Sequence, residues 1–291
     1  MKSFVKYLPA LLTSIVWGTT FVASKVVLSS GVTPLQLMFA RFVLGYVALW
    51  LAYPHLGGFR PLSRELRFAG LGLCGGSLYF LCEYEALRYT SAVNVGIIVS
   101  TVPLVTYALM ILLRRSFFSL RYALACLLAL VGVALIVFNG SFVFRPQLLG
   151  DLLAILAVLL WAAYTILLDA DNAETHPLLV SRRLFFYALL SLIPLLVISP
   201  SSVVSPLVFS SPALYPVIYL GLVASGACIW LWNVSVNVLG PSRTNAFLYL
   251  NTVIPVLASW LIFSSEVSRF HVFGSIFILA GLLLSQQDRR F

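Results

Sequence analysis

Long uncharged runs of apolar residues recur through the whole of this 291-residue chain. A run of about 20 such residues at 1.5 Å rise per residue covers the ~30 Å hydrocarbon core of a bilayer. Charged residues make up only 9% of the chain and hydrophobic residues 61%, whereas soluble domains average about 25% charged residues. A soluble fold is therefore excluded, and the chain is predicted to be an integral membrane protein. The runs predict ten transmembrane helices, at residues 7–28, 33–53, 67–87, 92–113, 121–138, 148–168, 178–198, 213–236, 243–263 and 270–286.

The basic residues between the runs predict how the chain is oriented in the membrane. With ten spans, both termini lie on one side, and that side collects most of the Lys and Arg residues in its short loops. The opposite side holds Arg88, Arg145 and Arg269. Because Lys and Arg are enriched in cytoplasmic loops, both termini are predicted to be cytoplasmic. The net charge of +9 thus reflects topology, and no nucleic-acid partner is expected.

One apolar segment pattern occurs twice in the chain, at 91–113 and again at 243–263. Each copy has an Asn near its start, a hydroxyl seven residues later and then a proline: Asn94, Thr101 and Pro103 in the first, Asn245, Thr252 and Pro255 in the second. Proline-interrupted segments at matching positions of two halves point to the binding site of a transporter. The alternative is a compositional likeness, because membrane helices often contain proline.

Neighbouring segments repeat in the same order. Trp17 in the first span is matched by Trp161 in the sixth, and Gly132 in the fifth by Gly281 in the tenth. Each half then has five spans, and because five is odd the halves enter the membrane in opposite senses. The predicted fold is an all-α membrane protein with ten transmembrane helices in two inverted five-helix repeats, residues 1–140 and 141–291, and a site where the repeats meet.

These residues resemble the drug/metabolite transporter superfamily, and within it the EamA-like ten-helix exporters. The resemblance covers nearly the whole chain and rests on four segments together: Trp17 to Lys25, Thr33 to Phe42, Glu83 to Asn94, and Pro255 to Glu266 with the glycine-bearing segment 274–281 after it. It implies a transporter of the bacterial cytoplasmic (inner) membrane, similar to bacterial amino-acid exporters. The direction of transport and amino acids as the substrate class come from this resemblance alone.

Motifs of other functions are weak. Gly70 to Gly75 matches the G-x-G-x-x-G dinucleotide fingerprint, but that motif needs a preceding strand, and here it lies in an uncharged span. Gly72 and Gly76 instead form a G-x-x-x-G surface for helix packing. The His residues lie in scattered loops without metal-ligand spacing, and no P-loop lysine or nucleophile-elbow serine occurs. Neither an enzyme nor a metal or other cofactor is expected.

Polar and aromatic residues inside the spans are the candidate site, because polar groups in hydrocarbon cost several kcal/mol unless they face protein or water. They form semi-polar helix faces that are able to line one cavity, and ordinary interhelical packing is the alternative. The residues predicted to bind the substrate are Trp17, Thr20, Tyr79, Glu83, Asn94, Thr101, Trp161, Tyr164, Trp230, Asn245 and Tyr249.

Charged residues within spans and the two prolines are given mainly structural roles. Arg41 is deep enough to pair with Glu83 or Glu85, or to bond backbone carbonyls. Lys25 either pairs with Glu83 or extends to the membrane surface. Pro103 and Pro255 are the predicted hinge positions.

The resulting prediction is a secondary transporter that exports small amphipathic metabolites, most of all aromatic or bulky apolar amino acids, by alternating access. A carboxylate would meet Asn94, Asn245 and backbone groups freed near the prolines, and an ammonium Glu83 or the ring faces of Trp17, Trp161 and Tyr79. Its expected partners are a small-molecule substrate and membrane lipid, and the sequence leaves the oligomeric state open. The alternatives are a passive facilitator and a membrane binding protein without transport.

Overall fold

A computed structural model describes residues 5–55, 58, 61–90, 92–140, 147–171, 176–198, 213–263 and 267–287. These residues are nearly all helical and contain no strand. The helices follow the order and approximate bounds of the ten expected spans: α2 (Leu8–Ser29), α3 (Pro34–Ala52), α4 (Leu62–Gly72) with η1 (Leu73–Ser77) and α5 (Leu78–Tyr89), α6 (Ala92–Val99) with α7 (Val102–Leu112), α8 (Leu120–Phe138), α9 (Leu148–Asp171), α10 (Pro177–Ile198), α11 (Leu214–Ile218) with η4 (Tyr219–Ala227) and α12 (Cys228–Leu239), α13 (Pro241–Ala246) with η5 (Phe247–Tyr249) and α14 (Leu250–Phe263), and α15 (Arg269–Gln286).

Eight helices in the described part of the chain are long and apolar enough to cross a membrane. They carry many large apolar side chains on the outside, such as Leu51 and Leu124, as expected where the solvent is lipid. The stretches 62–89 and 241–263 are not among the eight. The first is rich in glycine and acidic residues, and the second is divided among α13, η5 and α14. The all-α membrane fold is confirmed.

Local signals explain where several helices begin and end. Thr33 caps α3 in a capping box with Gln36, directly before Pro34, and this arrangement satisfies free backbone N–H groups at a helix start. Ser119 caps α8 by accepting a hydrogen bond from the Tyr122 amide. That helix ends at Asn139, whose φ of 44° lies in the left-handed region, a frequent way to stop a helix.

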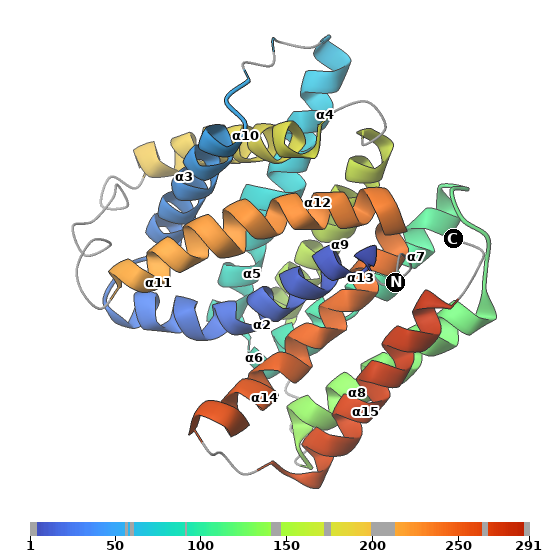
Figure 1. The fold of residues 1–291 in the computed structure, drawn as a ribbon. Coiled ribbons are helices and arrows are strands. Elements are labelled where there is room, and N and C mark those ends of the chain that lie inside the picture. The colour runs from blue at the N-terminus through green and yellow to red at the C-terminus, as the bar shows by residue number, and fades with distance from the viewer. Residues whose placement is uncertain are drawn as a thin grey trace.

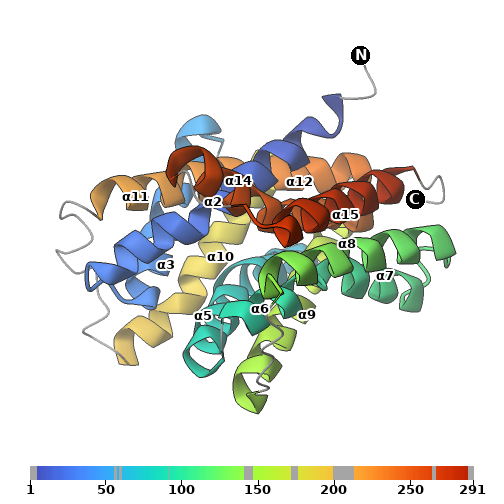
Figure 2. The same cartoon turned by 90° about the horizontal axis from the view of Figure 1, so that it is seen from below.

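Matching helices of the two halves each pack against helices of the opposite half, as is expected of an inverted repeat. α2 packs against α12 and α14, and the matching helix α9 packs against α5 and α7. α3 lies on η4, and α10 lies on η1 and α4. α8 and α15 run side by side at one edge of the molecule, away from α3 and α10 (Figures 1 and 2). The division of the chain at residue 140 stays a prediction.

The third and eighth expected spans each contain an irregular segment: η1 is kinked at Gly76, whose φ of −122° and ψ of −105° are not helical, and η4 has the wider turn of a π-helix. Both lie where glycine permits close helix packing. A Cβ on Gly72 would come within 2.7 Å of the Leu184 carbonyl oxygen on α10, and a Cβ on Gly221 within 2.5 Å of Leu44 Cβ on α3. A Cβ on Gly76 would lie 2.7 Å from that of Ala188. The prediction that Gly72 and Gly76 serve helix packing is confirmed.

Candidate functional site

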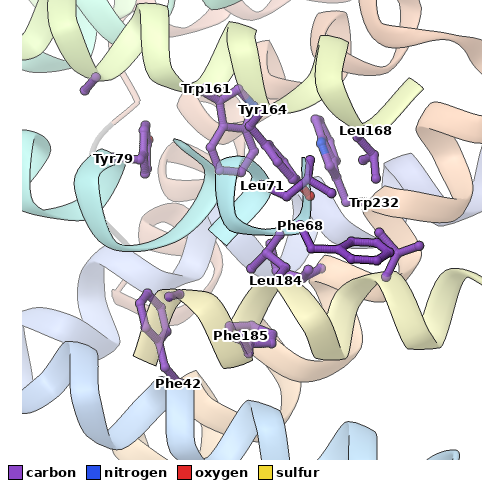
Figure 3. Close-up of a cluster of buried hydrophobic side chains, with 14 of the residues drawn as sticks. Phe42, Phe68, Leu71, Tyr79, Trp161, Tyr164, Leu168, Leu184, Phe185 and Trp232 are labelled. Atoms are coloured by element: carbon purple, nitrogen blue, oxygen red, sulfur yellow. The ribbon is translucent and has the colours of Figure 1, made fainter. Parts of the chain in front are cut away.

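Five aromatic residues from four helices meet at the centre of the molecule, and we call them the aromatic cluster: Trp17 on α2, Tyr79 on α5, Trp161 and Tyr164 on α9, and Trp232 on α12. Trp161 contacts all the others, with ring centroids 5.4 Å from Trp17, 4.9 Å from Tyr79, 5.1 Å from Tyr164 and 6.0 Å from Trp232. Figure 3 shows Trp161 and Tyr164 projecting from α9, with Trp232 beside them. Because α2 and α5 belong to the first half and α9 and α12 to the second, the cluster joins the halves.

Hydrogen bonds fix the indole rings of the two repeat-related tryptophans. Trp17 Nε1 donates to the Ala224 carbonyl oxygen at 2.9 Å, within η4. Trp161 Nε1 donates to Asn245 Oδ1 at 3.2 Å. Satisfied in this way, a buried indole N–H no longer carries a desolvation penalty. The cluster is thus tied to the π-helical segment η4 on one side and to α13 on the other.

An uncharged polar network extends from the cluster on the side of α9, α12 and α13. Asn245 is fully buried, and its Nδ2 donates to Thr106 Oγ1 at 2.8 Å and to Thr165 Oγ1 at 3.1 Å. Tyr164 donates its hydroxyl hydrogen to Asn233 Oδ1 at 2.7 Å. Amides and hydroxyls that bond across membrane helices in this way hold the helices together and offer polar groups without fixed charge.

A charged network extends from the cluster on the side of α3 and α5. Tyr79 donates its hydroxyl hydrogen to Glu83 Oε1 at 3.1 Å. Arg41 Nε donates to Ser225 Oγ in η4 at 2.9 Å, and its guanidinium lies 4.7 Å above the centre of the Phe80 ring. The carbonyl partners expected for Arg41 are replaced here by a side-chain hydroxyl and a ring face.

The remaining predicted site residues divide by location. Trp230 packs at the edge of the core that contains the cluster. Thr20 and Thr101 donate their hydroxyl hydrogens to carbonyl oxygens three residues earlier, those of Trp17 and Ile98, at 2.7 Å and 2.6 Å. Tyr249 donates to the Cys126 carbonyl oxygen at 3.3 Å in a separate hydrophobic group with Tyr107 and Tyr122, so the structure does not bring it to the cluster.

The two prolines stand in different settings. Pro103 lies in the first turn of α7, just after the break between α6 and α7 at Ser100 and Thr101. Pro255 lies inside α14, after the 3₁₀ turn η5. Each is therefore close to an irregular stretch of helix, and their role as hinges stays a prediction. The side chain of Lys25 and all of Glu266 lie outside the described residues.

Trp232 is the cluster residue that the sequence analysis missed, in favour of Trp230 two positions earlier. It is fully buried and contacts both Trp17 and Trp161. The repeat contains a signal for it, because Leu71–Leu73 and Leu220–Leu222 both read L-G-L. Glu83 and Trp232 each stand ten residues after the end of that motif, so the repeat places Trp232 at the position of a predicted site residue.

The two halves also contact each other at two ends of the molecule. Positions that the repeat relates make polar contacts at one end and an aromatic contact at the other. At one end, Asp151 Oδ1 accepts hydrogen bonds from Thr90 Oγ1 at 2.9 Å and Asn94 Nδ2 at 3.3 Å, and we call these three residues the Asp151 cluster. At the other end, Tyr7 packs against Phe247 with ring centroids 6.2 Å apart. Tyr7 precedes Trp17 by ten residues and Asp151 precedes Trp161 by ten, so the repeat relates the two.

Asp151→Ala is expected to raise the fraction of molecules that are open at the Asp151 cluster by about tenfold. Hydrogen bonds to a charged group contribute about 1.5–3 kcal/mol, and about 1.4 kcal/mol is a factor of ten in an equilibrium constant. The measurement is the rate at which a membrane-impermeant thiol reagent modifies a Val95→Cys reporter, since Val95 is buried directly beside Ala86 and Ala154 on α5 and α9.

The control for this experiment is Glu85→Gln, which removes an acid from the last turns of α5, the helix that ends just before Thr90 of the Asp151 cluster. Glu85 forms an exposed bridge with Arg88 at 2.9 Å, and exposed bridges contribute about 0–1 kcal/mol. Equal labelling rates in Asp151→Ala and Glu85→Gln would show that the Asp151 cluster does not hold this end closed.

Comparison with known proteins agrees with this architecture. Two segments, residues 5–138 and 148–286, match one family model, described as the EamA-like transporter family. An "Uncharacterized transporter" of Archaeoglobus fulgidus is 26% identical over 279 residues, 94% of each chain. The "Uncharacterized transporter YcxC" of Bacillus subtilis is 24% identical over 292 residues, which cover 95% of this chain and 91% of the relative. A solved structure titled "Crystal structure of protein" superposes with a TM-score of 0.78 at 17% identity, over 97% of this chain and 96% of the other, and so shares the fold.

Proposed function

Since the chain belongs to the EamA-like transporter family, we propose that it is a secondary transporter that exports small amphipathic metabolites, most of all aromatic or bulky apolar amino acids, by alternating access. The observation that carries this proposal is the aromatic cluster at the junction of the halves, with polar groups on both of its sides. Inverted-repeat transporters bind their substrates at such junctions.

The chemistry of the cluster suits an apolar side chain attached to polar groups. Ring faces attract a cation by about 0.5–2 kcal/mol, and aromatic pairs contribute about 0.5–1.5 kcal/mol beyond the area that they bury. A ligand with a ring would exchange the contacts between Trp17, Tyr79 and Trp161 for contacts with its own ring. Separating the rings in this way would also loosen the contact between the halves, which is the movement that alternating access needs.

We further propose that the protein lies in the cytoplasmic (inner) membrane of a bacterium with both termini in the cytoplasm. The support is the distribution of Lys and Arg among the loops and the resemblance to bacterial exporters.

Counterflow in liposomes tests the function. Purified protein is reconstituted with a high internal concentration of one unlabelled compound, and the same compound is added outside in labelled form, across a panel of amino acids, nucleosides and cationic drugs. Transient accumulation of an apolar or aromatic amino acid is expected. Uptake that never saturates would indicate a passive facilitator, and binding without any flux would indicate a membrane binding protein, and either result would overturn the proposal.

A further inference from the structure

Arg41 is a cation held inside the membrane domain, and among the described residues it forms no salt bridge with an acid. Its side chain is 5% exposed, on a helix that is long and apolar enough to span a bilayer. Its contacts are the Ser225 hydroxyl, the Phe80 ring face and the Tyr84 hydroxyl. A guanidinium carries five N–H donors. None of the contacts named here brings one of these donors to a carboxylate.

Glu83 on α5 is an acid that interacts electrostatically with Arg41. It is also buried, with 8% of its surface exposed. The salt bridges among the described residues nevertheless join Arg88 to Glu85 and Arg183 to Glu65, and none joins Arg41 to Glu83. The carboxylate instead accepts from the Tyr79 hydroxyl at 3.1 Å.

This separation has an energetic cost that a purely structural role does not explain. Each buried ion loses several kcal/mol of hydration, and direct pairing with an opposite charge is what offsets that loss. Here Arg41 bonds the Ser225 hydroxyl and Glu83 the Tyr79 hydroxyl, so each charged group has a neutral hydroxyl as its partner. A molecule with both a negative and a positive group would supply the missing partners and leave the site neutral.

The two charged residues adjoin the aromatic cluster. The Tyr79 ring packs on Trp161 at 4.9 Å while its hydroxyl bonds Glu83. The Phe80 ring lies beneath the Arg41 guanidinium and 5.0 Å from Tyr79. A ligand whose ring enters the cluster therefore has its charged end within the reach of both ions.

We propose that Arg41 and Glu83 determine the specificity of the site for zwitterions, with Arg41 binding a carboxylate and Glu83 an ammonium group. This inference rests on the proposed function, and it assigns Arg41 a direct contact with the substrate. It follows that the uncharged network around Asn245 and Asn233 contributes polar contacts but does not select the charge of the ligand.

The test compares phenylalanine with two analogues, phenethylamine, which lacks the carboxylate, and 3-phenylpropionate, which lacks the ammonium. Inhibition of phenylalanine counterflow and thermal stabilisation of the protein are measured for all three. The wild type should favour phenylalanine over each analogue by about tenfold or more, because a hydrogen bond to a charged group is worth about 1.5–3 kcal/mol. Arg41→Gln should lose the preference over phenethylamine, and Glu83→Gln the preference over 3-phenylpropionate.

Two further variants separate recognition from folding. Arg41→Lys keeps the charge without the planar fork and should retain part of the preference. Arg88→Gln, an exposed arginine at the end of α5, should change none of the ratios. A wild type that does not discriminate phenylalanine from its analogues overturns the inference whether or not the variants fold, and so do Arg41→Gln and Glu83→Gln variants that weaken all three compounds equally.

The outcomes for the two proposals are distinct. Saturable exchange of phenylalanine without discrimination between charges leaves the transport proposal standing and removes the inference. Phenylalanine that neither exchanges nor stabilises the protein removes the inference as well, and the counterflow panel then decides the transport proposal by itself.

Discussion

Gly132→Ala is expected to lower the apparent melting temperature of the detergent-solubilised protein by roughly 5–10 °C. α8 and α15 pack so closely that a Cβ on Gly132 would lie 2.5 Å from the Gly274 carbonyl oxygen and 2.9 Å from the Ile278 amide nitrogen. These are backbone atoms, which cannot rotate away as a side chain can. Overpacking of this kind costs about 1–3 kcal/mol or more, and each kcal/mol shifts the melting temperature by about 2–4 °C in a chain of this order of size.

Gly96→Ala is the matched control, because it adds the same methyl group to a helix in open space. Among the described residues, no atom beyond the adjoining backbone of its own helix lies within 4 Å of a Cβ on Gly96. Alanine stabilises a helix interior by roughly 0.5–1 kcal/mol relative to glycine. Both variants are heated in detergent and the remaining monodisperse protein is measured by size-exclusion chromatography. Equal melting temperatures for Gly132→Ala and Gly96→Ala would contradict the close packing of α8 on α15.

Trp161→Ala is expected to reduce counterflow per folded molecule by at least about tenfold, and Trp17→Ala to have a similar effect. Both rings lie in the aromatic cluster, and Trp161 contacts every other member. In the proposed site, loss of one ring would remove aromatic and cation–π contacts with the bound ligand, together about 1.4 kcal/mol or more. Rates are normalised to the monodisperse protein, because truncating a buried tryptophan also costs about 3–5 kcal/mol of stability.

Trp260→Ala serves as the control for these two variants, since Trp260 is 54% exposed on α14 and is expected to face lipid. Trp161→Phe adds a milder change that keeps a ring and loses the hydrogen bond to Asn245. If counterflow falls only in proportion to the loss of folded protein in Trp17→Ala and Trp161→Ala, the cluster is ordinary packing and does not bind the substrate.

The helices were predictable because the bilayer imposes their length and apolarity. The expected span 121–138 corresponds to α8 at Leu120–Phe138, and 148–168 to α9 at Leu148–Asp171. The irregular segments η1 and η4 were not predictable, because the atoms that their glycines contact belong to helices of the other half. Glycine at positions 72 and 221 was visible in the sequence, whereas the Leu184 and Leu44 atoms that those glycines meet were not.

The candidate site was predictable in its residue types and less so in its pairings. Trp17, Tyr79, Trp161 and Tyr164 come together as one cluster, since the repeat and helical spacing place them on facing helices. Helical spacing alone could not tell that Tyr249 faces α8. The Ser225 partner of Arg41 stands 184 positions away, and contacts at such a separation depend on the tertiary fold.

Under the proposed alternating access, the two ends of the molecule are expected to respond differently to temperature. Hydrogen bonds at Asp151 favour closure through enthalpy, whereas the apolar contact of Tyr7 with Phe247 gains most of its strength from the entropy of released water. Because apolar contacts weaken on cooling, we expect cold to favour conformers that open at Tyr7, and warmth to favour those that open at Asp151. The opening equilibrium of the proposed transporter is therefore expected to depend on the temperature at which the cell grows.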